Sequence, residues 1–467
     1  MIVKQKEMDK RINYKINEKT IFASASSLGI SAIKTVRISG SKTKKIIKLL
    51  TKKKLSSPKY YTLLKLYDLR NSTVIDKAVV VWFPGPKTYT GEDMLEINIH
   101  GSNAVLEHLI ENLLLIENVR EAKKGEFTKR AFSNNKMDFL EAEAVIDLIN
   151  AETKSQKSLA IDQMDGNLSK IFNLWSEKLK KLLAHYESQI DFSEEEVPKN
   201  VANKVIKEVN KLIKDMELLL SDKRSGEAIR KGVEIVIIGQ TNVGKSSLIN
   251  QIAKKDIAIV SKISGTTRDI IETKINLANI PVIISDTAGL KNKPKNIIEK
   301  KGIQKALAKI NNSDLKLFIL DLTKKITKNL LDLIDENTLL ILNKEDKVNN
   351  KNILSKIKYL NKINYRNICV VSAKEGTGIN NLLKNIDNYI KRKYKDVFFG
   401  EPVLTRTRHR EALEKCFAYL KKININKNPE LNAEDLRLAL YELGNITGKY
   451  NIEEMLDIIF KEFCIGK

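Results

Sequence analysis

The sequence predicts two fold classes in one chain, α/β plus all-α, with a doubly wound α/β domain inserted into a helical domain and another α/β domain in front. Between about residues 229 and 392, apolar runs of strand length alternate with helical patterns, as a doubly wound sheet requires. Residues 126–225, and those after Lys393, instead carry apolar residues at helical spacing. With 467 residues, the chain can hold two to four domains with ample cores.

The first domain is predicted over about residues 20–134, where short β-rich runs alternate with a helical pattern and turn residues follow one strand. The predicted strands cover 35–38, 78–83 and 94–99, and the predicted helix covers 104–116.

Long helices are predicted from residue 126 to 225, with a break near 191–198. A second helical region follows Lys393 and ends in an apolar stripe over 452–463, with Asn451 as its N-cap. Two helical segments on either side of an α/β domain indicate an insertion, because the ends of a domain often lie close together.

The inserted domain begins with a phosphate-binding loop at residues 239–246 (GQTNVGKS), directly after the apolar run 233–238. Backbone N–H groups of such a loop, which opens a helix, cradle the β- and γ-phosphates of a nucleotide. Lys245 adds a point charge, and Ser246 supplies a hydroxyl to Mg²⁺.

Two further motifs are typical of the γ-phosphate and Mg²⁺ environment. Residues 286–289 (DTAG) follow another apolar run, and an Asp at that place reaches Mg²⁺ through water while Gly289 admits a backbone N–H to the γ-phosphate. Residues 265–269 (GTTRD) lie between the two motifs, and Thr267 is the natural switch hydroxyl for Mg²⁺.

The identity of the base follows from residues 343–346 (NKED) and 372–374 (SAK), each behind a strand-like run. The Asp346 carboxylate can accept two hydrogen bonds from guanine, and adenine offers no such edge. Five motifs in this order predict a P-loop G domain that binds and hydrolyses GTP with Mg²⁺. The predicted nucleotide-binding residues are Asn242, Val243, Gly244, Lys245, Ser246, Ser247, Ser261, Lys262, Ile263, Ser264, Gly265, Thr266, Thr267, Asp286, Thr287, Ala288, Gly289, Asn343, Lys344, Asp346, Ser372, Ala373 and Lys374.

The hydrolytic machinery departs from the Ras pattern. Ras-like enzymes orient the attacking water with a Gln directly after the Asp-x-x-Gly motif, and here that position is Leu290, which cannot hydrogen-bond a water. No arginine is obviously placed to act as a finger in cis. The transition-state charge must therefore be stabilised in some other way.

Composition restricts the partners and the compartment. The net charge of +24 favours a polyanionic partner such as RNA, although the abundant Lys, Ile and Asn of an AT-rich genome give the same charge without one. Three widely spaced cysteines, Cys369, Cys416 and Cys464, exclude a disulfide framework and a zinc cluster and fit a cytoplasmic protein. No apolar run approaches the roughly 18 residues of a membrane span.

From about residue 20 onward the chain resembles the MnmE (TrmE) family of tRNA-modification GTPases. The C-terminal stretch 463–467 (FCIGK) is the most specific match beside a complete G domain. The other matching stretches, besides the five G motifs, are 36–40 (VRISG), 82–86 (WFPGP), 89–93 (YTGED), 125–132 (GEFTKRAF) and 141–144 (EAEA).

The resemblance implies a tetrahydrofolate-binding and dimerisation domain over 1–134, a helical domain in two segments (135–228 and 393–467), and a Ras-like G domain over 229–392. It also implies a homodimer that joins the FAD-dependent subunit MnmG in a heterotetramer-type complex. Together such proteins add an aminomethyl-type (carboxymethylaminomethyl) group to carbon 5 of the wobble uridine of certain tRNAs. The one-carbon unit comes from a 5-formyl or methylene tetrahydrofolate.

For hydrolysis, the resemblance implies that two G domains meet across their nucleotides and that K⁺ occupies the space of an arginine finger. Oxygen ligands suit such a hard cation. The water-orienting role matches Glu299, in a region where this sequence is one residue longer than the family pattern. The matching K⁺ ligands are Asn242, Ser261, Ile263 and Thr266.

For folate, the resemblance implies that Arg37, Glu96, Lys136 and Lys467 bind the ligand, since a carboxylate can pair with the pterin edge and basic groups suit the glutamate tail. The C-terminal stripe must then place its end against the N-terminal domain, which we expect to occur across the dimer. The loop 25–31 departs from the family pattern, because it holds one Gly and no Pro. Cys464 matches a reactive thiol near the one-carbon group, and an inert cysteine is the alternative.

Two other functions stay open at this point. The first is an RNA-binding switch protein, similar to ribosome-assembly GTPases, that remodels RNA without modifying it. The second is an adaptor whose G domain only gates dimerisation. The basic charge fits both the switch and the modification enzyme, whereas the first 130 or so residues and the C-terminal tail fit only the enzyme.

Overall fold

The computed structural model describes residues 19–27, 29–53, 57–191, 199–255, 272–277, 279–286, 309–326, 334–362, 365, 367–394, 401–424, 426–449, 463 and 466. The chain forms two compact units. Unit 1 comprises Met1–Ile146, Gln163–Glu177 and Leu440–Lys467, and unit 2 comprises Asp147–Asp162 and Lys178–Ala439.

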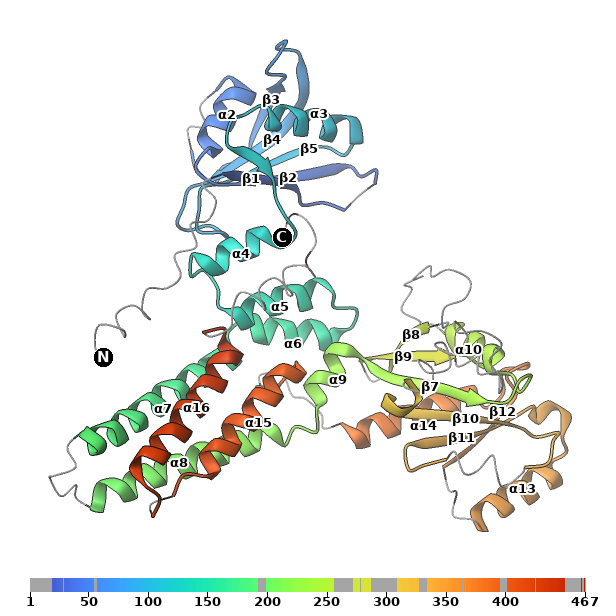
Figure 1. Ribbon diagram of the computed structural model, residues 1–467. Coiled ribbons are helices and arrows are strands. Elements are labelled where there is room, and N and C mark those ends of the chain that lie inside the picture. Colours follow the sequence, from blue (N-terminus) through green and yellow to red (C-terminus); the bar gives the residue numbers. More distant parts are fainter. Residues whose placement is uncertain are drawn as a thin grey trace, which may run out of the picture. The chain divides into compact units, whose positions relative to one another are not determined.

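Unit 1 contains a six-stranded mixed sheet with the order β3-β4-β5-β2-β1-β6 (Figure 1). Apolar side chains of α2 and α3, among them Ile46 and Leu109, pack on one face of this sheet, and Phe127 of α4 packs on the other. The elements are β1 (Thr20–Ser24), β2 (Ile33–Ser39), α2 (Thr43–Thr51), β3 (Thr62–Tyr67), β4 (Val74–Phe83), β5 (Met94–His100), α3 (Asn103–Leu114), β6 (Val119–Glu121) and α4 (Glu126–Ser133).

Helices follow this sheet, as the helical spacing predicted. The predicted break near 191–198 agrees with the end of α7 at Asp191 and the start of α8 at Lys199. The predicted helix 452–463 and its N-cap Asn451 lie outside the described residues, apart from Phe463, which is buried against Phe139 of α5. The helices are α5 (Phe139–Ile149), α6 (Lys154–Met164), α7 (Asn167–Asp191), α8 (Lys199–Leu220), α9 (Ser225–Lys231), α15 (Thr407–Lys421) and α16 (Pro429–Thr447).

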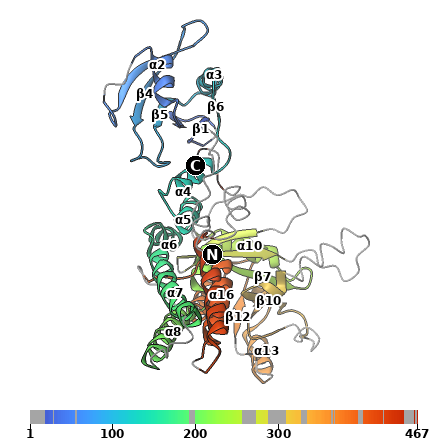
Figure 2. The same ribbon diagram turned by 60° about the vertical axis from the view of Figure 1, so that its left-hand side comes forward.

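Unit 2 contains the second six-stranded sheet, with the order β12-β11-β10-β7-β9-β8, in which only β8 is antiparallel to its neighbour. Helices α10 and α14 pack on one face and α13 on the other, which is the doubly wound arrangement (Figures 1 and 2). The elements are β7 (Val233–Gly239), α10 (Lys245–Ala253), β8 (Glu272–Leu277), β9 (Ile280–Asp286), β10 (Leu315–Asp321), β11 (Thr338–Asn343), the 3₁₀ turn η1 (Glu345–Lys347), α13 (Asn350–Lys362), β12 (Ile368–Val371) and α14 (Ile379–Lys393).

The predicted fold class is confirmed in these elements: the two sheets are α/β, and helices dominate the remainder of the described chain. The apolar stripe predicted on the last helix of the G domain is the buried face of α14, formed by Ile379, Leu382, Leu383, Ile386 and Ile390. Four of the five nucleotide motifs follow strands of one sheet, so the parallel strands bring them to the same edge.

Candidate functional site

The phosphate-binding loop connects β7 to α10, and its backbone conformation depends on two residues with positive φ. Asn242 has a φ of 63° and Gly244 a φ of 101°. A Cβ atom at Gly244 would lie 2.3 Å from Nδ2 of Asn343, so only glycine fits there. The loop therefore places the N-terminus of α10, with its free N–H groups, where phosphates can bind.

Charged and hydroxyl side chains of the loop point to the same region. The Lys245 ammonium donates to the carbonyl oxygens of Gly239 and Gln240, at 2.9 and 3.0 Å. The Ser246 hydroxyl donates to Oδ2 of Asp286 at 3.2 Å. Asp286 is buried, and its Oδ1 has no hydrogen-bond partner among the described residues. A serine hydroxyl beside a buried carboxylate with a free oxygen fits the hard-oxygen environment of Mg²⁺.

Asn343 connects the phosphate loop to the segment that follows β12. Its Nδ2 donates to the carbonyl oxygen of Val243 at 2.7 Å, and its Oδ1 accepts from the backbone N–H of Ala373 at 2.9 Å. The side chain is almost fully buried. Because both its amide oxygen and its amide nitrogen are used, Asn343 fixes the phosphate-binding and base-binding motifs relative to each other.

The predicted guanine-binding carboxylate is held by a residue of the fifth motif. The Ser372 hydroxyl donates to Oδ1 of Asp346 at 2.6 Å. This hydrogen bond, reinforced by the positive charges of Lys374 and Lys347, holds the pKa of Asp346 below its ordinary value. The carboxylate is exposed and ionised at neutral pH, as recognition of the guanine edge requires.

Asp321, at the end of β10, is a site residue that the sequence reasoning missed. The Lys344 ammonium donates to Oδ2 of Asp321 at 2.6 Å and to the carbonyl oxygen of Asn242 at 2.9 Å. Burial raises the pKa of Asp321, but hydrogen bonds from Lys344 and Thr323 outweigh burial and hold that pKa below its ordinary value. The available signal was a carboxylate directly after the apolar run 315–320.

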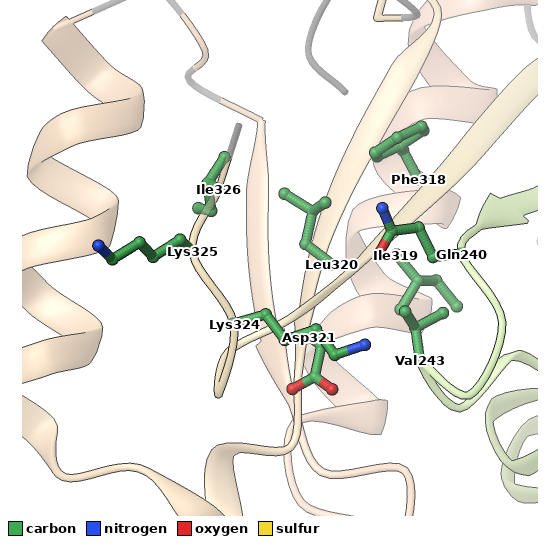
Figure 3. A pocket seen from close by; sticks show the side chains of 9 residues that line it. All are labelled: Gln240, Val243, Phe318, Ile319, Leu320, Asp321, Lys324, Lys325 and Ile326. Carbon is green, nitrogen blue, oxygen red and sulfur yellow. The ribbon is translucent and has the colours of Figure 1, made fainter. Parts of the chain in front are cut away.

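A cavity lies beside the phosphate loop (Figure 3). Gln240 and Val243 line one side of it, and the end of β10 with residues 324–326 lines the other. Val243, which lines the cavity, directly follows Asn242, whose carbonyl oxygen accepts a hydrogen bond from the Lys344 ammonium.

Several predicted site residues lie outside the described part of the chain, and their roles stay predictions. Among them are the switch residues, the proposed water-orienting Glu299 and the tail thiol. They are Ser261, Lys262, Ile263, Ser264, Gly265, Thr266, Thr267, Thr287, Ala288, Gly289, Glu299, Cys464 and Lys467. Leu290, on which the departure from the Ras pattern depends, lies outside it too.

Two of the four predicted folate ligands meet on the sheet of unit 1. Arg37 on β2 and Glu96 on β5 are paired in register, and the guanidinium contacts Oε1 of Glu96 through Nε at 3.0 Å and through a terminal nitrogen at 2.9 Å. Both side chains are about one-fifth exposed. Lys136 is exposed beyond the end of α4 and forms no hydrogen bond or ion pair with Arg37 or Glu96 among the described residues.

Tyr89 lies close to the same pair. Burial raises the pKa of Tyr89, while its hydrogen bond with Thr128 and then the positive charge of Arg37 act in the opposite direction. The Tyr89 hydroxyl is 2.8 Å from Oγ1 of Thr128 on α4. An acid, a base, a phenol and a hydroxyl thus gather on the sheet face that α2 and α3 leave uncovered.

The C-terminal tail reaches this sheet within a single chain. Gly466 has a φ of 101°, and a Cβ atom there would lie 2.6 Å from the carbonyl oxygen of Ser24. Ser24 ends β1, and its neighbour Ala23 is in register with Arg37. Gly466, the described residue of the stretch 464–467, lies against β1 of the same chain, in the direction predicted for the tail; the route across a dimer stays a prediction.

Arg130 connects two of the matching stretches, 89–93 and 125–132, to each other. Its guanidinium is buried and donates to Oε2 of Glu92 at 2.9 Å and to Oε1 of Glu126 at 3.1 Å. Glu92 in turn accepts from the Ser39 hydroxyl at 2.6 Å. This network fixes α4 against the end of β2, so its role is to shape the sheet face.

Comparisons with known proteins agree with this organisation. The family model "GTP-binding protein TrmE N-terminus" matches residues 20–136, and "MnmE helical domain" matches residues 139–464. The chain is 45% identical to the tRNA modification GTPase MnmE of Pelagibacter ubique and 40% identical to that of Rickettsia bellii, in each case over 96% of this chain and 100% of the relative. Among solved structures, the G domain of the T. maritima FeoB iron transporter is similar over 34% of this chain and 98% of its own, at 21% identity and a TM-score of 0.25. Within the described residues, no helix has the length and apolar character needed to span a membrane.

Proposed function

Because this chain belongs to the MnmE family of tRNA modification GTPases, we propose that it hydrolyses GTP to GDP and phosphate within a complex that modifies tRNA. The product is an aminomethyl-type (carboxymethylaminomethyl) group on carbon 5 of the wobble uridine, made with a folate-derived one-carbon unit. The observation that carries the proposal is Asn343, which joins the phosphate loop to the guanine-binding segment through two hydrogen bonds.

The G domain supplies binding and charge stabilisation. Ser246, Asp286 and the predicted Thr267 form the oxygen environment for Mg²⁺, which neutralises phosphate charge when bound. When the nucleotide binds, the Lys245 ammonium leaves the carbonyl oxygens of Gly239 and Gln240 and donates to phosphate oxygens. Charged phosphate oxygens are stronger acceptors than neutral carbonyl oxygens. Asp346 orients the guanine edge.

K⁺ takes the role of the missing arginine finger. The Asn242 side chain is exposed and has no hydrogen-bond partner among the described residues, so its amide oxygen is available as a ligand. Its backbone carbonyl is held by Lys344, which fixes the position from which the side chain projects. Asn242 completes the K⁺ site with Ser261, Ile263 and Thr266, and Glu299 orients the attacking water.

The face of the unit 1 sheet opposite α2 and α3, which carries Arg37 and Glu96, binds the folate. Glu96, which is paired with Arg37, presents a carboxylate to the pterin, while Lys136 and Lys467 provide positive charge for the glutamate tail. The contact between Gly466 and Ser24 supports this proposal. Ser24 is next to Ala23 on β1, and Ala23 is in register with Arg37 on β2. Cys464 then lies on the same tail as a candidate reactive thiol.

The protein works as a homodimer in the cytoplasm, and it acts together with the FAD-dependent subunit MnmG on certain tRNAs. Two chains are needed because the K⁺-dependent mechanism places two G domains face to face. The domain limits are those proposed from the sequence, at residues 134, 228 and 392.

A nucleoside profile of tRNA tests the function. Cells that lack the protein should lose the wobble-uridine modification and regain it with the wild-type chain, but not with the Asp286→Ala variant, which lacks the Mg²⁺-site carboxylate. Unchanged nucleosides together with a ribosome-assembly defect would overturn the proposal in favour of an RNA-remodelling switch. Unchanged nucleosides without such a defect would leave only the adaptor function.

A further inference from the structure

One face of α8 carries a row of lysines with a regular helical spacing. Lys204, Lys207, Lys211 and Lys214 follow one another at intervals of three, four and three residues, and all four are exposed. This spacing places them along a single stripe of an α-helix. We call these four residues the α8 lysine stripe.

The opposite face of α8 is fixed by the protein core. Val205, Val209, Leu212 and Met216 are buried, and α8 packs against α15. Because the helix cannot rotate without exposing these side chains, the lysine stripe has one defined direction, toward solvent.

The charges of the stripe are not neutralised within the described part of the chain. None of the four lysines forms a hydrogen bond or an ion pair there, although Glu208 and Asp215 follow Lys204 and Lys211 by four residues. In both pairs the lysine precedes the acid, which is the less favourable order because both charges then oppose the helix dipole. Glu208 also precedes Lys211 by three residues, so the two acids reduce the positive charge of this face without cancelling that of four lysines. Elsewhere in unit 2, Lys274 pairs with Glu152 at 3.0 Å.

We propose that the α8 lysine stripe binds the phosphate backbone of RNA. With a rise of about 1.5 Å per residue, the stripe extends about 15 Å, whereas the charges along double-stranded DNA are spaced by roughly 1.7 Å of axis, and RNA carries the same phosphate at every nucleotide. Each ammonium can therefore reach its own phosphate. Lysines that contact phosphates position a nucleic acid without reading its bases. That the RNA is tRNA rests on the proposed function.

An RNA backbone fits this helix better than a lipid surface does. A helix that lies on a membrane inserts its apolar face between the lipids. The apolar face of α8 is occupied by the protein core, so only the charged face remains available.

The experiment compares two variants of the full chain that lose the same charge. The stripe variant is K204Q/K207Q/K211Q/K214Q, and the control variant is K351Q/K358Q/K362Q/K384Q, which removes four exposed lysines from α13 and α14. Binding to an unmodified tRNA transcript with a wobble uridine is measured by fluorescence anisotropy over a series of KCl concentrations. GTP hydrolysis by both variants serves as the test of folding and should match the wild type.

We expect the stripe variant to bind tRNA at least about tenfold more weakly, with a salt dependence shallower by about 3 in log K against log [salt], since each phosphate contact contributes roughly 0.7–0.9. The control variant should keep most of the affinity. An equal loss in both variants, or none in the stripe variant, would overturn the stripe and leave the proposed function intact. If the wild type itself binds no tRNA, the RNA part of the proposed function fails as well.

Binding to vesicles that contain phosphatidylserine is measured as well, to distinguish an anionic membrane surface from RNA as the partner. If the stripe variant loses vesicle binding and keeps tRNA binding, a membrane surface replaces RNA as the partner and the inference is wrong.

Discussion

Ser372 and Asp346 are joined by a hydrogen bond of 2.6 Å, in which the Ser372 hydroxyl donates to Oδ1 of the carboxylate. The two residues belong to separate motifs, 26 positions apart in the sequence. The bond holds an otherwise exposed carboxylate in one orientation and favours its ionised form. The proposed guanine site therefore draws on both motifs: Asp346 supplies the carboxylate, and Ser372 holds it in place.

Exchanging Asp346 for Asn should move base preference from guanine toward xanthine, whose edge carries a carbonyl where guanine has its amine. Loss of a charge-assisted hydrogen bond should weaken GTP binding by about 10- to 100-fold. Competition binding between GTP and XTP measures the preference. Ser372→Ala is the matched control, since it should weaken GTP binding but keep guanine preferred. Unchanged discrimination in Asp346→Asn would contradict the assignment.

Asn242→Ala should abolish the stimulation of GTP hydrolysis by K⁺, while GTP binding weakens by no more than the about 1–2 kcal/mol that Ala costs at a φ of 63°. The carbonyl of residue 242, which Lys344 holds at 2.9 Å, is retained, and only the free side-chain oxygen is lost. Turnover is compared in KCl and NaCl at equal ionic strength. Equal turnover of the wild type in both salts would rule out K⁺ catalysis, and a K⁺ response in the variant would remove Asn242 from the ligand set.

Gly466→Ala should weaken binding of 5-formyltetrahydrofolate by at least about tenfold, because the added Cβ would lie 2.6 Å from the Ser24 carbonyl and displace the tail. Calorimetric titration measures the affinity, and GTP hydrolysis in KCl should not change. Gly166→Ala is the control: it also has a positive φ, but its nearest neighbour is the movable Glu141 carboxylate at 3.1 Å. Full folate affinity in Gly466→Ala would separate the tail from the ligand.

Arg410→Ala should destabilise the protein by about 3–5 kcal/mol, because it leaves the buried carboxylates of Glu227 and Asp222 without their partner. Each of the two lies 2.5 Å from the Arg410 guanidinium, which connects α15 to α9 and the end of α8. The exposed Arg437, paired with Glu187 at 3.2 Å, is the control and should cost no more than about 1 kcal/mol when changed to Ala. Urea unfolding measures both, and similar values would contradict the argument.

Tyr389 should make stability fall in strongly alkaline solution. Its hydroxyl lies 2.7 Å from the carbonyl oxygen of Asp314 and 2.7 Å from Oδ1 of Asn337, and its one proton is donated to either acceptor. Burial, followed by the negative charge of Asp314, raises the pKa of Tyr389 from 10.0 to about 12. A raised pKa means that the native state holds the proton more tightly, so this contribution is complete below pH 10 and is lost as pH rises to about 12.

The Tyr389→Phe variant tests this contribution through urea unfolding at several pH values. It should be less stable than the wild type at neutral pH, and the difference should shrink above pH 10. A constant difference across the alkaline range would show that ionisation of Tyr389 is not involved.

Short-range patterns predicted much of the fold. The buried positions of α14 follow from its apolar spacing, and the strands before four nucleotide motifs follow from largely apolar runs, because a strand buried on both faces is apolar along most of its length. The missed strand β10 has the same signal in residues 315–320, but no recognised motif follows it. Its terminal Asp321 therefore gained meaning only from Lys344.

By itself, the sequence determined which residue types are available for phosphate, Mg²⁺ and guanine, because these chemistries depend on local motifs behind strands. Only the tertiary structure decided which residues that are distant in the sequence contact one another. It paired Arg37 with Glu96, placed Lys136 beside Gly91, and placed Gly466 against Ser24 of the same chain. The physical reason is that hydrogen bonds and ion pairs act over about 3 Å. Contacts so short between residues that are far apart in the sequence depend on sheet register and chain path, which no local pattern encodes.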